Sequence, residues 1–215
     1  MRRGSSDIIN IAKPRTEKLL LFFYLLQYSH VWKANLGDNY ELLNMDKNLI
    51  FTFGLDRAGK TVISNYFTTG LVMKEVRPTL TVNYSKIILA DIALRYCDAP
   101  GQKTLRKIWE KSYKTAYLLI FVLDVADHIR YEESRSELLR VLADPNVADV
   151  PILFLFNKMD LPEAQENFEF AREFFTLKEL QGRDAYYFKT TAEDPTTLAA
   201  VKTKLIELVK KVVGL

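Results

Sequence analysis

The sequence carries the octapeptide Gly54-Leu55-Asp56-Arg57-Ala58-Gly59-Lys60-Thr61, which fits the G-x-x-x-x-G-K-[ST] pattern of phosphate-binding loops. An apolar, β-prone run from Leu49 to Phe53 precedes the loop, and a helix is predicted from Thr61 to Phe67. In such a loop the glycines turn backbone N–H groups onto phosphates, and the lysine reaches the β- and γ-phosphates. The threonine hydroxyl is a ligand for Mg²⁺. The octapeptide therefore predicts a nucleotide-phosphate site between a strand and a helix.

A second motif, Asp98-Ala99-Pro100-Gly101-Gln102, follows the apolar run from Ile92 to Cys97. Its carboxylate is expected at the end of a strand, where it can hold Mg²⁺ through water. The N–H of Gly101 can be offered to a γ-phosphate. The motif therefore predicts a second group of ligands for the same nucleotide.

The third motif, Asn157-Lys158-Met159-Asp160, follows the apolar run from Pro151 to Phe156 and matches the guanine-reading pattern Asn-Lys-x-Asp. A carboxylate accepts both the N1–H and the N2–H of guanine, whereas adenine offers no such pair of donors. The stem of Lys158 can lie along the base. Thr190-Thr191-Ala192 fits the last element, in which the Ala192 N–H meets guanine O6. These motifs predict a guanine nucleotide.

Strand and helix signals alternate from residue 47 onward. The terminal helix is expected after Asp194-Pro195, which suits a capped helix start. Such alternation predicts a mostly parallel sheet covered on both faces, with ligand loops at the carboxyl ends of the strands. Strands are expected near 48–53, 82–89, 92–98, 117–124, 151–156 and 185–188.

With these motifs the chain resembles the Ras-like small GTPases and, among them, a divergent member of the Arf family, over about residues 47–213. The Arf resemblance rests on the sequence of the phosphate loop, on the segment Arg77 to Asn83, which resembles the first switch, and on Gln102 to Trp109, which resembles the second switch. It implies an α/β, P-loop small-GTPase (Ras-like) fold. The expected architecture is a mostly parallel six-stranded sheet with helices on both faces and an N-terminal helical extension.

The resemblance also implies roles for individual residues. Thr61, Thr79 and Asp98 would serve the Mg²⁺, and Gln102, Lys60 and Thr79 would be catalytic, with Gln102 orienting the attacking water. GTP and GDP would be bound by Asp56, Arg57, Ala58, Gly59, Lys60, Thr61, Val62, Thr79, Gly101, Asn157, Lys158, Asp160, Thr191 and Ala192. Without an arginine finger such sites hydrolyse GTP at roughly 10⁻⁴ s⁻¹. We therefore expect a GTPase-activating protein, an exchange factor and effector proteins as partners.

Several positions depart from the Arf pattern. Pro100 stands where the family has a glycine, so the second switch has one N–H fewer and a restricted backbone. Arg57 is a long cation within the phosphate loop, and its side chain is expected to point to solvent rather than to the phosphates. The hydrophobic triad that meets Arf effectors would fall on Val82, Cys97 and Ser112, none of which is aromatic.

Length and composition agree with one GTPase domain and an appendage. The chain has 215 residues, of which 48% are hydrophobic and 27% charged. We expect an N-terminal extension over residues 1–46 and a small GTPase domain over 47–215. The net charge of +3 is too small to predict nucleic-acid binding. The single cysteine excludes an intramolecular disulfide, which favours a cytoplasmic location.

The extension contains the apolar block Leu19 to Leu26, which is flanked by basic residues. This block is shorter than the roughly 20 apolar residues that span a bilayer. Two hypotheses follow: residues 14–34 form a helix that binds reversibly to the cytoplasmic face of a membrane, or the helix is buried against its own domain or a partner. In Arf proteins the nucleotide state governs exposure of such a helix. Arg2 excludes N-myristoylation, which requires glycine there.

Two functions from different classes fit these features. The first is a GTP-hydrolysing molecular switch of Arf type. The second is a non-cycling, GTP-bound scaffold or membrane-receptor subunit similar to the β subunit of the signal-recognition-particle receptor, which Pro100 and the apolar block favour. A P-loop kinase is disfavoured because the sequence has no acceptor-site motif.

Overall fold

The computed structural model describes residues 48–73, 76–89, 92–176, 180 and 182–213. The predicted extension 1–46 lies outside these residues. The strands are β1 (Leu49–Phe53), β2 (Asn83–Leu89), β3 (Ile92–Asp98), β4 (Ala116–Asp124), β5 (Ile152–Asn157) and β6 (Ala185–Lys189). The helices are α2 (Lys60–Thr69), α3 (Trp109–Tyr113), α4 (Tyr131–Leu142), α5 (Pro162–Phe174) and α6 (Pro195–Val213), with 3₁₀ turns η1 (Lys103–Ile108), η2 (His128–Arg130) and η3 (Pro145–Val147).

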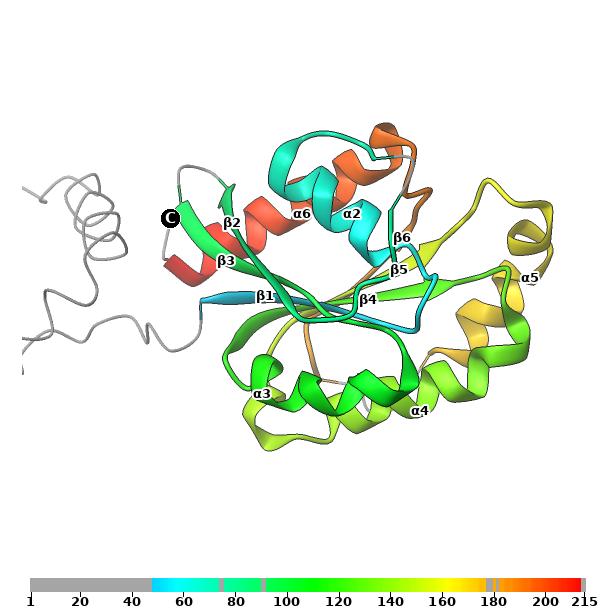
Figure 1. The fold of residues 1–215 in the computed structure, drawn as a ribbon, viewed down its shortest axis with the longest axis horizontal. Coiled ribbons are helices and arrows are strands. Elements are labelled where there is room, and N and C mark those ends of the chain that lie inside the picture. Colours follow the sequence, from blue (N-terminus) through cyan, green and yellow to red (C-terminus); the bar gives the residue numbers. More distant parts are fainter. Residues whose placement is uncertain (1–47, 74–75, 90–91, 177–179, 181, 214–215) are drawn as a thin grey trace, which may run out of the picture. The chain divides into compact units, whose positions relative to one another are not determined.

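The six strands form one sheet in the order β2-β3-β1-β4-β5-β6. Every neighbouring pair is parallel except β2 and β3, which are antiparallel. Figure 1 shows β1 in the middle of the sheet, with the β2–β3 hairpin to one side and β4 to β6 on the other. The direction of winding therefore reverses at β1, and in open α/β sheets ligands bind beside that point. The mostly parallel six-stranded sheet predicted from the sequence is confirmed.

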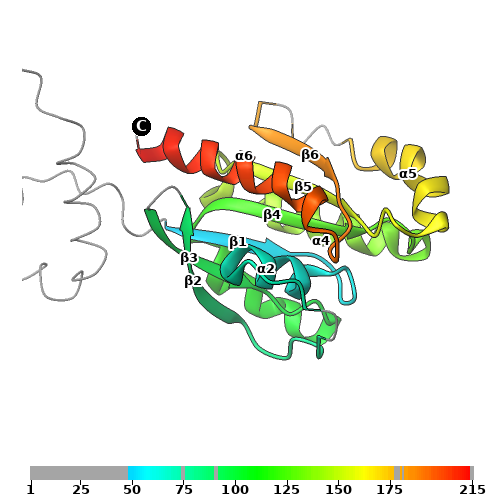
Figure 2. The ribbon, with the colours of Figure 1, turned by 90° about the horizontal axis from the view of Figure 1, so that it is seen from above.

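Helices cover both faces of the sheet, as predicted. α2 and α6 lie on one face, and α3, α4 and α5 lie on the other (Figures 1 and 2). Because both faces are covered, β1 and β5 are buried at every residue. No helix of the described residues has the length and hydrophobicity needed to cross a bilayer.

Aromatic rings dominate the core beneath the α3–α4–α5 face. The Phe53 ring meets Trp109 edge-on at a centroid distance of 5.6 Å and Phe121 at 5.1 Å, and Phe121 contacts Phe154 at 4.9 Å. Each such pair stabilises the folded state by about 1 kcal/mol in addition to the hydrophobic contribution of the area it buries. Trp109 is the first residue of α3, so this packing attaches the segment after the second motif directly to β1.

The ends of the helices follow from local chemistry. α2 stops at Gly70, whose positive φ of 76° closes the helix through an N–H bond to the Tyr66 carbonyl. α6 begins at Pro195, and the Asp194 carboxylate accepts the N–H of Thr196 at 2.9 Å. Leu198, Val201, Leu205 and Leu208 form the buried stripe of α6. The predicted capped start of this helix is confirmed.

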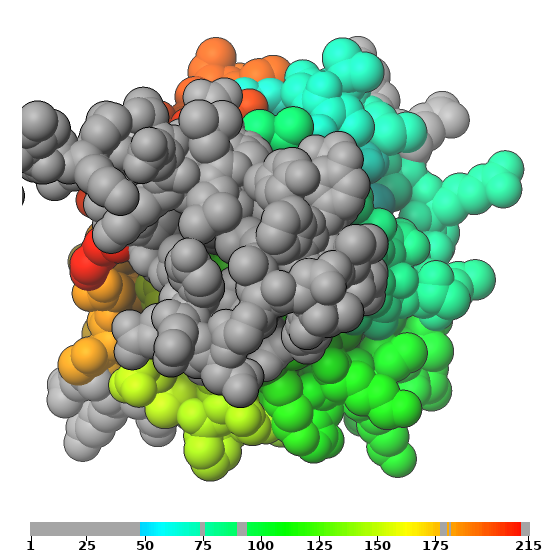
Figure 3. Space-filling model, turned by 90° about the vertical axis from the view of Figure 1, so that its left-hand side faces the viewer, coloured from blue at the N-terminus to red at the C-terminus, as the bar shows by residue number. Residues whose placement is uncertain are grey.

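β2 and β6 are the two edges of the sheet. Figure 3 views the molecule from the left-hand side of Figure 1, and the teal residues of the β2 region and the orange residues of β6 flank the view on opposite sides. On β2, Tyr84, Lys86 and Ile88 point to one face and are exposed. Lys86 lies directly opposite Arg95 of β3, which is also exposed.

A small polar cluster lies under α2. Tyr96 of β3 is fully buried, and its hydroxyl accepts a hydrogen bond from Thr52 at 2.6 Å and a longer one from Ser64 at 3.4 Å. Burial raises the pKa of Tyr96 far above its usual value, so the phenol stays protonated. Tyr96 therefore joins β1, β3 and the first helix after the phosphate loop through one hydroxyl.

The variant Tyr96→Phe removes that hydroxyl and leaves the buried Thr52 donor without an acceptor. We expect the free energy of unfolding to fall by about 1–3 kcal/mol. Denaturant melts of the wild type and the variant would measure this difference. The matched control is Tyr187→Phe on β6, where the ring is 45% exposed and a change below about 0.5 kcal/mol is expected. Equal losses in the two variants would contradict the role assigned to Tyr96.

Candidate nucleotide-binding site

The phosphate loop leaves β1 through two glycines that the surroundings require. Gly54 has a φ of 143°, and a Cβ there would lie 2.3 Å from the Val122 carbonyl oxygen. Gly59 has a φ of 94°, and its Cβ would lie 2.3 Å from the Asn157 amide nitrogen. A side chain at either position would force the loop away from β4 or from the third motif. The loop therefore needs glycine at both positions, at Gly54 because of the β4 backbone and at Gly59 because of the Asn157 side chain.

The remaining loop residues differ in exposure. Ala58 is buried and Asp56 is half-buried, whereas the side chain of Arg57 is exposed, as the sequence predicts. Arg57 has a φ of 65°, which costs a non-glycine residue about 1 kcal/mol. Val62 follows in the first turn of α2 and is half-buried.

Lys60 is the buried cation of the loop. It is 5% exposed, and its ammonium donates to the Leu55 carbonyl at 2.7 Å, across the mouth of the loop. Burial lowers the pKa of Lys60 to about 8, and the nearby carboxylates of Asp98 and Asp56 oppose this shift. The ammonium thus lies among backbone atoms of the loop that is expected to hold the phosphates.

The three predicted magnesium residues meet at one point. The Thr61 hydroxyl bonds to the Thr79 hydroxyl at 2.8 Å and donates to Asp98 Oδ2 at 2.7 Å, and Thr79 lies 3.4 Å from the same oxygen. The other carboxylate oxygen, Asp98 Oδ1, is buried and has no hydrogen-bond partner among the residues that the structure describes. Burial raises the pKa of Asp98, and the Thr61 hydrogen bond and Lys60 oppose that shift.

This set of donors fits Mg²⁺. All of its atoms are oxygens, which the ion prefers, and it combines a carboxylate with hydroxyls, so water and phosphate oxygens would complete the six ligands of the ion. Among the residues that the structure describes, no group of three or more His, Cys, Asp or Glu side chains gathers as an alternative metal centre. The unpartnered Asp98 oxygen is the atom that such an ion and its water would satisfy.

The segment from Ala99 to Gln102 packs tightly on the phosphate loop. The Ala99 N–H donates to the Thr52 carbonyl at 3.1 Å. A Cβ on Gly101 would lie 2.3 Å from the backbone nitrogen of Asp56. The side chain of Gln102 is half-buried and makes no hydrogen bond to the described residues. The Gln102 carboxamide therefore stays available beside a backbone whose position is strongly restricted.

The guanine motifs join the phosphate loop through Asn157. This side chain is fully buried, donates to the Ala58 carbonyl at 2.8 Å and accepts from the Thr190 hydroxyl at 3.1 Å. The Met159 N–H donates to the Thr190 carbonyl at 3.1 Å. Asn157 thus ties together the loops that follow β1, β5 and β6, and its role in the described structure is to position them.

The other guanine residues lie around that junction. Lys158 has a φ of 67°, and its ammonium pairs with Asp124 at the end of β4 at 2.7 Å. Asp160 is exposed, so its carboxylate is accessible to a base. Thr191 is half-buried and its N–H donates to the Thr197 hydroxyl, while Ala192 is 8% exposed. The structure thus brings the four sequence motifs together at the carboxyl ends of the strands.

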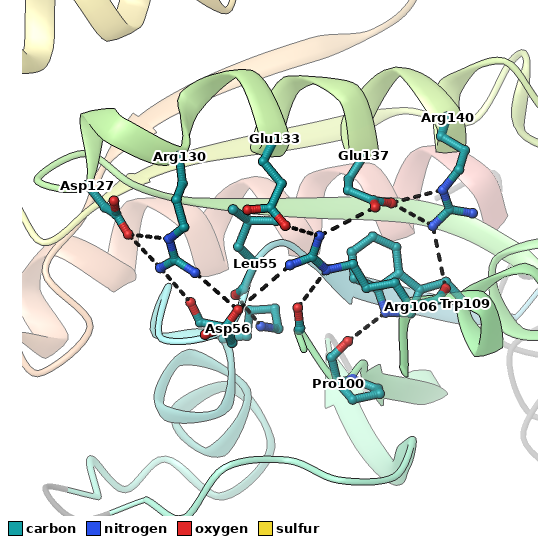
Figure 4. Close-up of polar contacts among 12 residues, drawn as sticks. Leu55, Asp56, Pro100, Arg106, Trp109, Asp127, Arg130, Glu133, Glu137 and Arg140 are labelled. Carbon is teal, nitrogen blue, oxygen red and sulfur yellow. Dashed lines mark hydrogen bonds and ion pairs between the residues drawn. The ribbon is translucent and has the colours of Figure 1, made fainter. Parts of the chain in front are cut away.

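Sequence reasoning missed a network of charges on the other side of the phosphate loop (Figure 4). Arg130 of η2 donates to the Asp56 carboxylate at 3.1 Å and to its carbonyl at 3.2 Å. Arg106 of η1 is 2% exposed and pairs with Glu133 of α4 at 2.8 Å. Asp56 is a carboxylate inside a loop that binds anions, and it therefore needs cations nearby. The presence of Asp56 was the signal in the sequence that could have led to these arginines.

The fold and the site together define a P-loop guanine-nucleotide-binding protein of the small GTPase class. Over residues 38–209 the sequence matches the family model of the ADP-ribosylation factor (Arf) family, and the chain belongs to that family. Members of the family are GTP-binding switch proteins that use guanine nucleotide and Mg²⁺, and the identification of an Arf-family relative from the sequence is confirmed.

Individual relatives agree with the family assignment. ADP-ribosylation factor-like proteins 8d and 8c of Arabidopsis thaliana are each 29% identical to the chain, and the alignments cover 76% and 77% of this chain and 90% and 94% of the relatives. The Arl6 (BBS3) small GTPase of Trypanosoma brucei with bound GppNp has a TM-score of 0.64 at 24% identity, covering 76% of this chain and 96% of that one. The mammalian SRP receptor has a TM-score of 0.59 at 16% identity, covering 74% and 99%. At these identities the two solved structures show the fold alone.

The lowered pKa of Lys60 predicts how nucleotide affinity depends on pH. Below pH 8, Lys60 is protonated with or without nucleotide, so its charge does not change on binding. Above pH 8 the Lys60 side chain of the free protein is largely deprotonated. Because the phosphates favour the charged ammonium, Lys60 must take up a proton when the nucleotide binds, and the observed affinity falls as the pH rises. We therefore expect GDP affinity to fall about tenfold between pH 8 and 9.5, as titrations with a fluorescent GDP analogue would measure.

Lys60→Arg is the control for this titration, because a guanidinium remains protonated throughout that range. Deprotonation of the guanine base contributes equally in both proteins, so only the difference between them reports on Lys60. An identical fall in the variant and the wild type would contradict the prediction.

Proposed function

We propose that the chain is a GTP-hydrolysing switch that cycles between GDP-bound and GTP-bound states. The observation that carries this proposal is the convergence of Thr61, Thr79 and Asp98. These residues come from the phosphate loop, the first switch and the Asp98–Gln102 motif that leads into the second switch, and their side-chain oxygens lie within 2.7 to 3.4 Å of one another. A ligand bound there contacts both switches at once, so loss of the γ-phosphate after hydrolysis would release Thr79.

Each residue of the site has a separate role in GTP hydrolysis. Lys60 and the loop N–H groups hold the β- and γ-phosphates, Gly101 offers its N–H to the γ-phosphate, and the free Gln102 carboxamide orients the attacking water. When bound by Thr61, Thr79 and Asp98, Mg²⁺ neutralises charge on the phosphate oxygens. Phosphoryl transfer depends on such positioning and charge stabilisation more than on covalent chemistry. Asp160, Lys158 and Ala192 select guanine.

Regulation by a GTPase-activating protein is expected because no arginine of the described residues is placed to act on the phosphates. Within the described residues, Arg106 and Arg130 are already engaged with carboxylates, and the side chain of Arg57 is exposed. We propose that a GTPase-activating protein supplies an arginine, which adds about 10³- to 10⁵-fold to the rate. An exchange factor would release GDP, and effector proteins would bind the GTP state.

The domain arrangement belongs to the proposal as well. Residues 47–215 would form the GTPase domain, and residues 1–46 the extension whose exposure depends on the nucleotide. The chain would work in the cytoplasm, free or peripheral on the cytoplasmic face of a membrane, and bind that surface reversibly through residues 14–34.

One observation favours the second function, a non-cycling GTP-bound scaffold or receptor subunit. The Pro100 carbonyl accepts a hydrogen bond from Trp109 Nε1 at 2.7 Å, and Trp109 is fully buried in the core. A second switch fixed in this way suits a protein that retains GTP as a structural ligand. The two functions differ in whether bound GTP is converted.

Conversion of bound GTP to GDP decides between the two functions. We expect the purified chain, loaded with GTP and Mg²⁺, to convert it at roughly 10⁻⁴ s⁻¹, as measured by chromatography of the bound nucleotide over hours. Gln102→Leu keeps the volume but cannot orient water, and it should slow conversion at least tenfold. GTP that persists unchanged for a day in the wild type would support the scaffold instead.

The proposed coupling to the extension can be tested by flotation with anionic liposomes. We expect the full chain to float more when loaded with a non-hydrolysable GTP analogue than with GDP, because the apolar block is then available to the membrane. A chain that starts at Asp46 is the control and should stay unbound in both states. Absence of flotation in every state would direct the search to protein complexes.

A further inference from the structure

The backbone of the second switch is anchored at four consecutive residues. The Ala99 N–H bonds to β1, the Pro100 carbonyl accepts from Trp109, the Gly101 carbonyl accepts from Arg106 Nε at 2.6 Å, and the Gln102 carbonyl accepts from the Leu105 N–H at 2.9 Å. The anchors at Pro100 and Gly101 are side chains that reach back from later in the chain. Of these two, Trp109 belongs to the apolar core, whereas Arg106 is a buried ion.

Arg106 connects the second switch to two other parts of the molecule. Its guanidinium donates to Glu133 at 2.8 Å and to Glu137 at 3.4 Å, and Nη2 lies 3.7 Å from the carboxylate of Asp56 (Figure 4). The two glutamates are one helical turn apart and face the same side of α4. The guanidinium thus spans the phosphate loop, the second switch and α4.

We propose that Arg106 is the positioning residue of GTP hydrolysis, which acts by fixing the orientation of Gln102. This inference rests on the proposed function, in which Gln102 orients the attacking water. The Gly101 carbonyl and the Gln102 N–H belong to one planar peptide unit. A guanidinium that holds the carbonyl therefore also restricts the positions of the Gln102 N–H and Cα, from which the carboxamide side chain extends.

The energetics favour a positioning role over a purely stabilising one. A buried ion pair costs desolvation, and apolar residues of similar volume often stabilise a fold equally well. η1 is already attached to the core through Trp109, so Arg106 is not needed to hold it there. What the arginine adds is a rigid fork with several donors in fixed directions, which no apolar residue provides.

The geometry explains why lysine cannot replace this residue. Lysine presents one ammonium group on a flexible stem, whereas Arg106 uses Nε for Gly101 and Nη1 for the glutamates at the same time. Arg106→Lys therefore keeps the charge near Asp56 and α4 but loosens the Gly101 peptide. Misplacement of a reacting group by about 1 Å can cost about 100-fold in rate.

The test is a double-mutant cycle on single-turnover GTP hydrolysis in the full chain. We expect Arg106→Lys to slow hydrolysis about 10- to 100-fold while the Kd values for GDP and GTP change less than about threefold. In the Gln102→Ala background the same substitution should change the residual rate less than about twofold, because the residue through which it acts is gone. Lys111→Gln, at an exposed position of α3 beyond the second switch, is the control and should keep the wild-type rate.

A second variant covers the case in which Arg106→Lys fails to fold. Glu133→Gln weakens one anchor of the guanidinium at a half-buried position, and a threefold to tenfold loss is expected, again absent in the Gln102→Ala background. Wild-type rates in both variants, or equal losses with and without Gln102, would overturn the positioning role while the proposed function stands. A wild-type chain that never converts GTP would overturn the proposed function and this inference with it.

Discussion

The burial of β1 between β3 and β4 is the constraint on which the rest of the structure depends. Because β1 runs parallel to both neighbours, the carboxyl ends of the three strands lie side by side. The phosphate loop leaves one of these ends, and Asp98 and Asp124 stand at the others. The phosphate loop and its surroundings are then tied together: the Ala99 N–H after β3 bonds to the Thr52 carbonyl of β1, and the side chain of Asn157 at the end of β5 donates to the Ala58 carbonyl. The site is therefore a property of how the strands are ordered, and its side chains occupy positions that the sheet has already set.

Much of this arrangement was predictable from the sequence, since strand order and loop motifs follow local rules. The six strands begin and end within one residue of their predicted bounds, and Thr61, Thr79 and Asp98 meet although they are far apart in the chain. Arg106 and Tyr96 were not predictable in the same way. Their partners lie on other elements, and the distances between elements depend on how the aromatic core packs. The one-turn spacing of Glu133 and Glu137 was visible in the sequence, but nothing local identified the cation that they face.

The departures from the Arf pattern also have structural consequences. Pro100 lacks an N–H, yet its carbonyl is used by Trp109, so the substitution leaves that peptide anchored. Two positions of the expected effector triad, Cys97 and Ser112, are buried, whereas Tyr84 is half exposed and bonds to Ser112 at 2.7 Å. One exposed aromatic side chain, Tyr84 of β2, therefore lies beside Ser112. A partner that binds Arf proteins through the hydrophobic triad would meet a different surface here.

The pairing of Lys86 with Arg95 has a consequence for how the protein behaves in a crowded solution. Two like charges directly across a hairpin weaken it slightly, and neither forms an ion pair with any described residue. Lys86 stands between the exposed Tyr84 and Ile88 on an edge strand, which is where a second sheet could add and start an aggregate. A further strand would bury the lysine without a counter-charge. The Lys86 charge thus opposes the addition of a further strand along an edge that also presents the exposed side chains of Tyr84 and Ile88.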